Sequence, residues 1–187
     1  MIKKLAIAVV LVLPTIFNFA HPVQAETPLT AEVSPPGDIP DNQAFVVFTS
    51  PAGYSIKLPE GWARKDEGNK TTFSDKYNHL TLLLMDNTNP IDEAFAKTNL
   101  IPELEKTDRA VDKVVIKKLP QKSGPMLVLD YDSNSEPNAV TNKQIREENE
   151  RAYFVKGNQL VTLTLSAPKG ADNVDQWKLM VDSFRWK

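Results

Sequence analysis

The first half of the chain alternates apolar and polar residues over short stretches, which is the pattern of half-buried β-strands. Residues 45–48 are a run of strand-forming residues and residues 54–58 alternate strictly, with Pro-Ala-Gly at 51–53 between them. This arrangement predicts a β-hairpin. Residues 62–64 and 70–73 predict a second, shorter hairpin, so the folded part opens with antiparallel strands.

The run at residues 80–85 is apolar on both faces of the pleat, apart from Thr81. Such a strand is typical of a sheet that is covered on both sides, so we expect layers above and below it. Further along, Gly157-Asn158 marks the turn of another hairpin. The later strands are predicted at residues 111–119, 126–131, 151–155 and 160–165.

Apolar residues at helical spacing predict a helix in the middle of the chain. Asn89 is its expected cap and Pro90 its first residue, while Pro102 is expected to limit or kink it and residues 103–108 to add a turn. Its apolar side is expected to hold Ile91, Ala94, Phe95 and Thr98.

A second helix is predicted at the end of the chain, from about Asp172. It should pack on the sheet through one apolar stripe formed by Val174, Trp177, Val181 and Phe184. Many antiparallel strands with one helix in mid-chain and one at the end indicate an α+β fold. We expect an antiparallel β-sheet sandwiched between helices.

The N-terminal segment has the three-part layout of a secretory signal peptide. A basic start is followed by an almost wholly apolar run at residues 5–19 and by Val23-Gln24-Ala25, which has small residues where a peptidase needs them. Cleavage is expected between Ala25 and Glu26. The alternative is an uncleaved anchor, but the run is shorter than the about 20 residues that span a bilayer, and Pro14 interrupts it.

After the predicted signal peptide of residues 1–25, residues 26–43 are rich in proline and lack hydrophobic periodicity. This composition predicts a flexible, extended N-terminal segment. Residues 44–187 then form a single domain, a size that can bury a core without disulfides.

Charge and composition exclude several classes of function. Removing Lys3 and Lys4 with the signal peptide leaves 20 basic against 24 acidic side chains, a net charge of −4, which argues against nucleic-acid binding. The chain has no cysteine, so disulfides, thiol chemistry and lipidation of a cysteine are excluded. His79 is the one histidine beyond residue 25, too few for a zinc site within one copy.

No pattern of nucleophilic or phosphate chemistry stands out in the sequence. The Gly-x-Ser-x-Gly elbow is absent, and the glycines at 61 and 68 lack the Gly-Lys-Ser/Thr ending of a phosphate loop. We therefore expect a protein that binds rather than an enzyme.

Several motifs resemble the PsbP superfamily. Residues 48–62, FTSPAGYSIKLPEGW, resemble its opening hairpin; residues 73–75 and 78–82 resemble the next one, and Ser-Phe-Arg at 183–185 matches its usual ending. The resemblance extends from about residue 45 to the C-terminus. It implies an α/β/α sandwich and a non-enzymatic role.

Members of this superfamily include the extrinsic photosystem II subunit of the thylakoid lumen, Ran-binding Mog-type proteins and exported bacterial proteins of unclear role. The photosystem subunit helps to retain calcium and chloride for water oxidation. The resemblance thus implies an exported accessory or assembly protein, bound peripherally to a membrane protein complex in the thylakoid lumen, the periplasm or outside the cell. This chain departs from the pattern because it has no cysteine to lipidate and keeps only His79 as a histidine ligand.

One acidic stretch begins like the calcium loop of an EF-hand. Its candidate calcium ligands are Asp130, Asp132 and Asn134, which offer hard oxygen atoms at alternate positions. The loop lacks glycine at its sixth position, which is Ser135, and glutamate at its twelfth, which is Thr141. The alternative is a solvated loop at the end of a strand.

The densest basic cluster is formed by Lys113, Lys117, Lys118 and Lys122, on a predicted strand and its turn. Lysine on an edge strand commonly blocks aggregation, and the functional alternative is a docking face for an acidic partner or membrane surface. We expect a monomer that docks through these lysines. The rival hypothesis is a carrier of small molecules or lipids, with an apolar pocket lined by Leu80, Leu82 and Leu84.

Overall fold

The computed structural model describes residues 26–117 and 127–187. The predicted signal peptide and two members of the lysine cluster, Lys118 and Lys122, lie outside the described residues. Within the described part, no helix is long and apolar enough to cross a membrane.

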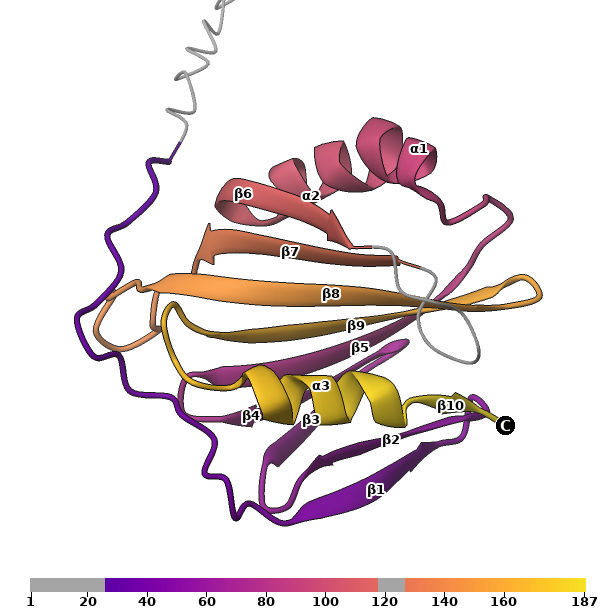
Figure 1. Ribbon diagram of the computed structural model, residues 1–187, viewed down its shortest axis with the longest axis horizontal. Coiled ribbons are helices and arrows are strands. Elements are labelled where there is room, and N and C mark those ends of the chain that lie inside the picture. Colours follow the sequence, from indigo (N-terminus) through magenta and orange to yellow (C-terminus); the bar gives the residue numbers. More distant parts are fainter. Residues whose placement is uncertain (1–25, 118–126) are drawn as a thin grey trace, which may run out of the picture.

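The main element is a seven-stranded antiparallel sheet with the order β3-β4-β5-β9-β8-β7-β6 (Figure 1). Two meanders, β3 to β5 and β6 to β9, meet where β5 pairs with β9, and the predicted turn at Gly157-Asn158 joins β8 to β9. Its strands are β3 (Ala63–Glu67), β4 (Lys70–Asp75), β5 (Asn78–Asp86), β6 (Arg109–Lys117), β7 (Leu127–Asn134), β8 (Arg146–Lys156) and β9 (Gln159–Pro168).

A smaller sheet of three strands has the order β1-β2-β10. The predicted hairpin forms β1 (Phe45–Ser50) and β2 (Tyr54–Pro59), and β10 (Arg185–Trp186) pairs with β2. Phe184 lies between the two sheets. Its ring stacks on Tyr54 at 5.5 Å and on Phe154 of β8 at 3.9 Å between centroids.

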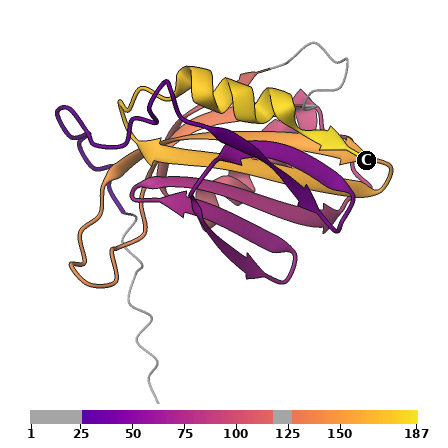
Figure 2. The ribbon, with the colours of Figure 1, turned by 90° about the horizontal axis from the view of Figure 1, so that it is seen from below.

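Helices cover both faces of the large sheet (Figure 2). One face, called the α3 face, packs against α3 (Val174–Ser183). The opposite face packs against the segment of α1 (Glu93–Phe95), the π-helix η1 (Ala96–Leu100) and α2 (Ile101–Thr107). The predicted α+β sandwich is confirmed.

The terminal helix packs on the sheet through three of the four predicted residues, Trp177, Val181 and Phe184, and Val174 is the exception. Val174 is 73% exposed, whereas Gln176 and Met180 are buried together with Trp177 and Val181. The reason is the N-cap, Asn173, which is 1% exposed and bonds inward, so the helix turns its first apolar residue toward solvent.

The mid-chain helix begins later than predicted. Its cap is Asp92, whose carboxylate accepts a hydrogen bond from the Phe95 amide at 2.8 Å, and Asn89 lies before the helix. Pro102 does not end the helical segment, because the π-helical turn before it leaves the proline near the start of α2.

The two faces of β5 are not equally covered. Leu80 and Leu82 are fully buried on the α3 face, but Thr81 and Leu83 on the opposite face are half-buried. The apolar cluster beneath α1, η1 and α2 covers only part of the opposite face. The expectation of layers on both sides is therefore correct for the sheet and only half correct for this strand.

Residues 26–43 have no helix or strand and run along one end of the large sheet (Figure 1). The Leu29 amide donates to Oδ1 of Asn134 at 2.9 Å, and the Ile39 amide donates to Oδ1 of Asn173 at 2.7 Å. The Ile39 side chain is buried in the core. We call this segment the strap, because its contacts fix it to the domain where the sequence predicted a flexible segment.

Candidate functional site

Four of the seven residues singled out in the sequence for calcium or docking gather on the α3 face, around a cavity of about 350 Å³ beside the start of α3. Its charged lining consists of Lys113, Lys117, Lys169, Asp130, Asp132, Glu148 and Glu150, and we call these residues the lysine–carboxylate cluster. Trp177 and Val174 of α3 form one wall of the cavity.

The edge strand β6 reaches this cluster through an irregular backbone. Its pairing with β7 shifts register between Arg109 and Asp112 and again between Asp112 and Val115. Ala110 and Lys113 have φ values of 45° and 53°, in the left-handed region that residues with a side chain rarely adopt. These bulges change the direction in which the side chains of β6 point, so that Lys113 extends across β7.

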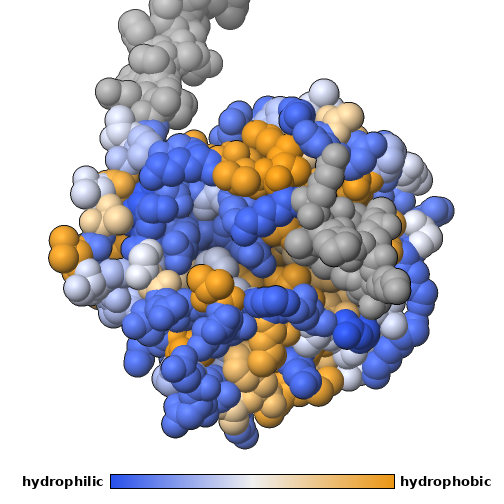
Figure 3. Space-filling model, viewed as in Figure 1, coloured by the Kyte–Doolittle hydropathy of each residue, from blue (hydrophilic) through white to orange (hydrophobic). Residues whose placement is uncertain are grey.

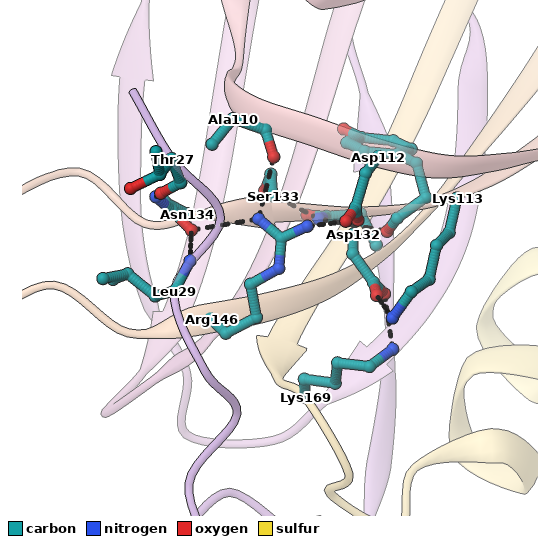
Figure 4. Close-up of polar contacts among 12 residues, drawn as sticks. Thr27, Leu29, Ala110, Asp112, Lys113, Asp132, Ser133, Asn134, Arg146 and Lys169 are labelled. Atoms are coloured by element: carbon teal, nitrogen blue, oxygen red, sulfur yellow. Dashed lines mark hydrogen bonds and ion pairs between the residues drawn. The ribbon is translucent and has the colours of Figure 1, made fainter. Parts of the chain in front are cut away.

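Both described lysines of the predicted cluster pair with carboxylates of β7. The Lys113 Nζ lies 3.2 Å from Oδ2 of Asp132, whose Oδ1 accepts from Lys169 at 2.6 Å (Figure 4). Lys117 pairs with Asp130, and the hydrogen bond that its ammonium group donates to that carboxylate raises the pKa of Lys117. Asp132 is buried, while the side chains of Lys113 and Lys117 are 66% and 48% exposed.

Two glutamates of β8 complete the cluster, because the register places Glu148 opposite Asp132 and Glu150 opposite Asp130. Burial raises the pKa of both glutamates, and the neighbouring aspartates act in the same direction. Three ammonium groups thus face four carboxylates. The surface is of mixed sign and differs from the purely basic face that the sequence predicted.

The residues proposed for calcium lie in a strand, because β7 continues to Asn134 beyond its predicted end at residue 131. The alternative of a solvated loop is therefore wrong. Asp130 and Asp132 share one face with Asn134, yet each carboxylate already faces an ammonium group. Over residues 26–117 and 127–187, no group of three or more His, Asp or Glu side chains is arranged to hold a metal ion.

Asn134 is held by a network that sequence reasoning missed. Its Oδ1 accepts from the Leu29 amide and, at 2.9 Å, from Nη1 of Arg146 (Figure 4). Arg146 also donates to the Ala110 carbonyl at 2.8 Å and pairs with Asp112. A guanidinium group that is 3% exposed beside Asn134 opposes binding of a cation there.

This network ties three parts of the chain together: the strap, the first bulge of β6 and the start of β8. A buried guanidinium group needs a carboxylate and hydrogen-bond acceptors, and Arg146 has Asp112, Asn134 and the Ala110 carbonyl. No local pattern could reveal it, since Arg146 lies 34 residues from Asp112 along the chain.

The opposite face of the same strands holds a second polar region. Two neighbouring cavities, of about 260 and 350 Å³, share Glu136 and Glu147, and His79 lines the smaller one. Burial lowers the pKa of His79, so its imidazole is neutral at pH 7. Burial, with the charges of Asp108 and Glu136 acting in the same direction, raises the pKa of Glu147 to about 7.

The larger cavity is bordered by a closed polar triad. The Tyr131 hydroxyl donates to Oδ2 of Asp108 at 2.7 Å, and Nη2 of Arg151 lies 3.1 Å from the same oxygen. Nε of Arg151 donates to Thr164 at 2.9 Å. Glu147, in contrast, makes no hydrogen bond or ion pair with any side chain in the described residues.

The apolar pocket of the carrier hypothesis is not formed by the expected leucines. Leu80 and Leu82 are completely buried in the core beneath α3, and Leu84 packs against that core. None of these three side chains lines the cavities described above. The cavities on both faces are lined largely by polar and charged side chains.

No protein-family model and no curated protein matches the sequence. Solved structures match it at the level of fold. A protein from Bacteroides thetaiotaomicron aligns at 14% identity and a TM-score of 0.47 over 75% of this chain, which spans about half (48%) of that protein. Cyanobacterial PsbP (CyanoP) from Synechocystis sp. PCC 6803 aligns at 12% identity and a TM-score of 0.49, over 81% of this chain and 98% of its own.

A mutant of the protein Mog1 aligns at 9% identity with a TM-score of 0.50, over 78% of this chain and 96% of its own. Likeness at such low identity is informative about the fold alone. The antiparallel sheet with helices on both faces is the arrangement that the sequence resemblance implied. The chain has a PsbP/Mog1-like α+β fold.

Proposed function

We propose that the protein is an exported, non-enzymatic accessory domain that attaches peripherally to a membrane protein complex through the β6 side of the lysine–carboxylate cluster. The observation that supports this role is the pair Lys113 and Lys117. Each lysine forms an ion pair with a carboxylate of β7, yet about half or more of each side chain remains exposed at the edge of the sheet.

Ion pairing to β7 suits these lysines to specific docking. The carboxylates hold both ammonium groups in place, so the lysine side chains lose less entropy when a partner binds them. Because the cluster contains both signs of charge, it selects a partner with a complementary pattern. The surface in Figure 3 is mostly hydrophilic, with scattered apolar patches, which favours a contact of this polar kind.

The overall charge opposes attachment to an anionic surface, since the chain beyond residue 25 carries −4. Attachment therefore depends on local contacts that are worth about 0–1 kcal/mol for each exposed pair. Contacts of this kind weaken as salt shortens the screening length to about 8 Å or less. Washing isolated membranes with concentrated salt should release the protein.

The decisive experiment compares two double variants on opposite edges of the sheet. Lys113→Gln with Lys117→Gln should abolish rebinding to washed membranes. The matched control, Lys65→Gln with Lys70→Gln, removes two exposed lysines that pair with Glu67 at the β3 edge, and should rebind normally. Equal rebinding by both variants, or retention through the salt wash, would contradict docking through β6.

The identity of the complex follows from the organism. In a photosynthetic source we propose the lumenal side of photosystem II, with a calcium-linked role as the finer alternative. Purified complexes should then carry the protein, and its removal should increase their calcium requirement. In an organism without reaction centres the partner is another extracytoplasmic complex.

A second candidate function is binding of a small polar molecule on the opposite face. Glu147 supports it, since this half-buried carboxyl borders two cavities and lacks a partner within the described chain. Native mass spectrometry of protein from its own host should show a retained mass that Glu147→Gln loses. A clean apo mass for the unmodified protein would contradict this candidate.

A further inference from the structure

Four strands form the outer edges of the two sheets, and three of them are protected against pairing with another strand. All five residues of β3 are exposed, and four of them are charged. β6 carries Lys113 and Lys117 and two bulges, and β10 has only two residues. Short length, lysine and bulges are the usual means of protecting an edge.

The fourth edge, β1, has none of these protections. Its sequence, FVVFTS, contains no charge, proline or glycine, and its pairing with β2 runs without a register shift. Val47 is 63% exposed and Val46 is 41% exposed. β1 lies at the lower border of the molecule in Figure 1 with no element beyond it, and apolar residues show near that border in Figure 3.

The hydrogen-bond pattern leaves one side of β1 free to pair. The Glu60 amide donates to the Ala44 carbonyl at 2.8 Å, so the residues of β1 that bond to β2 are those at even positions. The N–H and C=O groups of Phe45, Val47 and Thr49 therefore point away from β2. Among the described residues, no other backbone group bonds to them.

We propose that two copies of this chain associate through β1, antiparallel about a twofold axis at Val47, which joins the two small sheets into one. This register pairs Val47 with Val47 of the second copy and Phe45 with Thr49, so every outward backbone group of both strands finds a partner. The strand is its own complement because it carries no charge that would face a like charge.

The nearest charges do not oppose this pairing. Lys57 lies opposite Val47 on β2, so in the dimer it is separated from its copy by three strand spacings of about 4.8 Å. That distance, roughly 14 Å, exceeds the screening length of about 8 Å at physiological salt. The proposal uses a different surface from β6, so it is independent of the proposed docking function.

The first test measures mass against protein concentration by sedimentation. The unmodified protein should shift from monomer to dimer, and Val47→Lys should weaken association roughly tenfold, since it places two ammonium groups directly opposite each other. The control Val115→Lys changes an exposed valine of another edge strand, which is 52% exposed on the protected strand β6, and should dimerise normally.

The second test uses the absence of cysteine in the chain. Directly opposed, hydrogen-bonded residues have Cα atoms about 5.5 Å apart, within the range that a disulfide spans. Under mild oxidation Val47→Cys should form a covalent dimer, while Val115→Cys should not. The proposal would be overturned if the protein stayed monomeric at every concentration and both variants crosslinked equally. The β1 edge would then be expected to pair with a strand from another protein.

Discussion

Arg146 and Glu147 are neighbours in β8 and point to opposite faces of the sheet, and their surroundings could hardly differ more. Arg146 is 4% exposed and has three partners, which lie on β6 and β7. Glu147 is half-buried and has none in the described chain. The charge of Arg146 is thus fully compensated, whereas that of Glu147 has no compensating partner in the described chain.

The difference separates structural polar groups from those available for binding. A buried charge with a full set of partners holds segments in register, and losing one partner leaves the others unsatisfied. A half-buried charge without partners destabilises the fold when it ionises, and a ligand can remove that cost. The Arg146 network is therefore structural, and the Glu147 carboxyl is available to a ligand.

The strongest test of this contrast removes the guanidinium group. Arg146→Met should destabilise the protein by about 3 kcal/mol, because Asp112, Asn134 and the Ala110 carbonyl lose their shared donor. Urea unfolding gives the free energy. As a control, Arg64→Met removes an exposed ion pair with Asp66 and should change stability by no more than about 0.5 kcal/mol.

A second test asks whether buried polar contacts hold the strap in place, as they hold Arg146. Asn173→Ala should cost about 2 kcal/mol, because the Ile39 amide loses its buried acceptor and Oδ1 of Asn78 loses its buried donor. Limited proteolysis should then cut faster within residues 26–43. Unchanged stability and unchanged cleavage would support the flexible segment that the sequence predicted.

A third test uses the pH dependence of Glu147. Its folded pKa of about 7 lies above the ordinary 4.5, so the folded state binds more protons between these values and stability falls as pH rises through that window. Glu147→Gln should therefore stabilise the protein by about 1–2 kcal/mol above pH 7 and by nothing near pH 4.

The control for this test has the opposite sign. Hydrogen bonds from Lys65 and Lys70 lower the pKa of Glu67, so its contribution is present above the ordinary pKa and is lost on acidification. Glu67→Gln should not stabilise the protein at pH 8. Thermal melts of both variants across the pH range distinguish the two cases, and parallel profiles would contradict the assignment of Glu147.

The sequence predicts the hairpins, the mixed fold class and the helices on both sides of the sheet, because hydrophobic periodicity and turn residues are local signals. It fails where polar residues find distant partners. Asp130 to Asn134 resemble a loop along the chain, yet they form a strand because side chains from β6, β8 and the strap neutralise or bond them. The strap was predicted to be flexible for the same reason.

The candidate site was predicted in part. Lys113 and Lys117 were recognised from their density, but the aspartates beneath them were assigned to calcium, so the pairing of the two groups was missed. Lys169 lies 37 residues from Asp132, and only the register of β7 with β8 and β9 brings it near. No sequence pattern pointed to Glu147, because its lack of a polar partner depends on the three-dimensional surroundings.

The smallest expected effect concerns Lys169, which shares the buried carboxylate of Asp132 with Lys113. Lys169→Gln should cost only about 0.5–1 kcal/mol, because Lys113 still compensates the aspartate and the glutamine can donate one hydrogen bond. Combining it with Lys113→Gln should cost more than the sum of the single changes, since Asp132 then stays charged and buried without a cation. A double-mutant cycle in urea measures this coupling. Strict additivity would show that the two lysines act independently and do not share the compensation of the Asp132 charge.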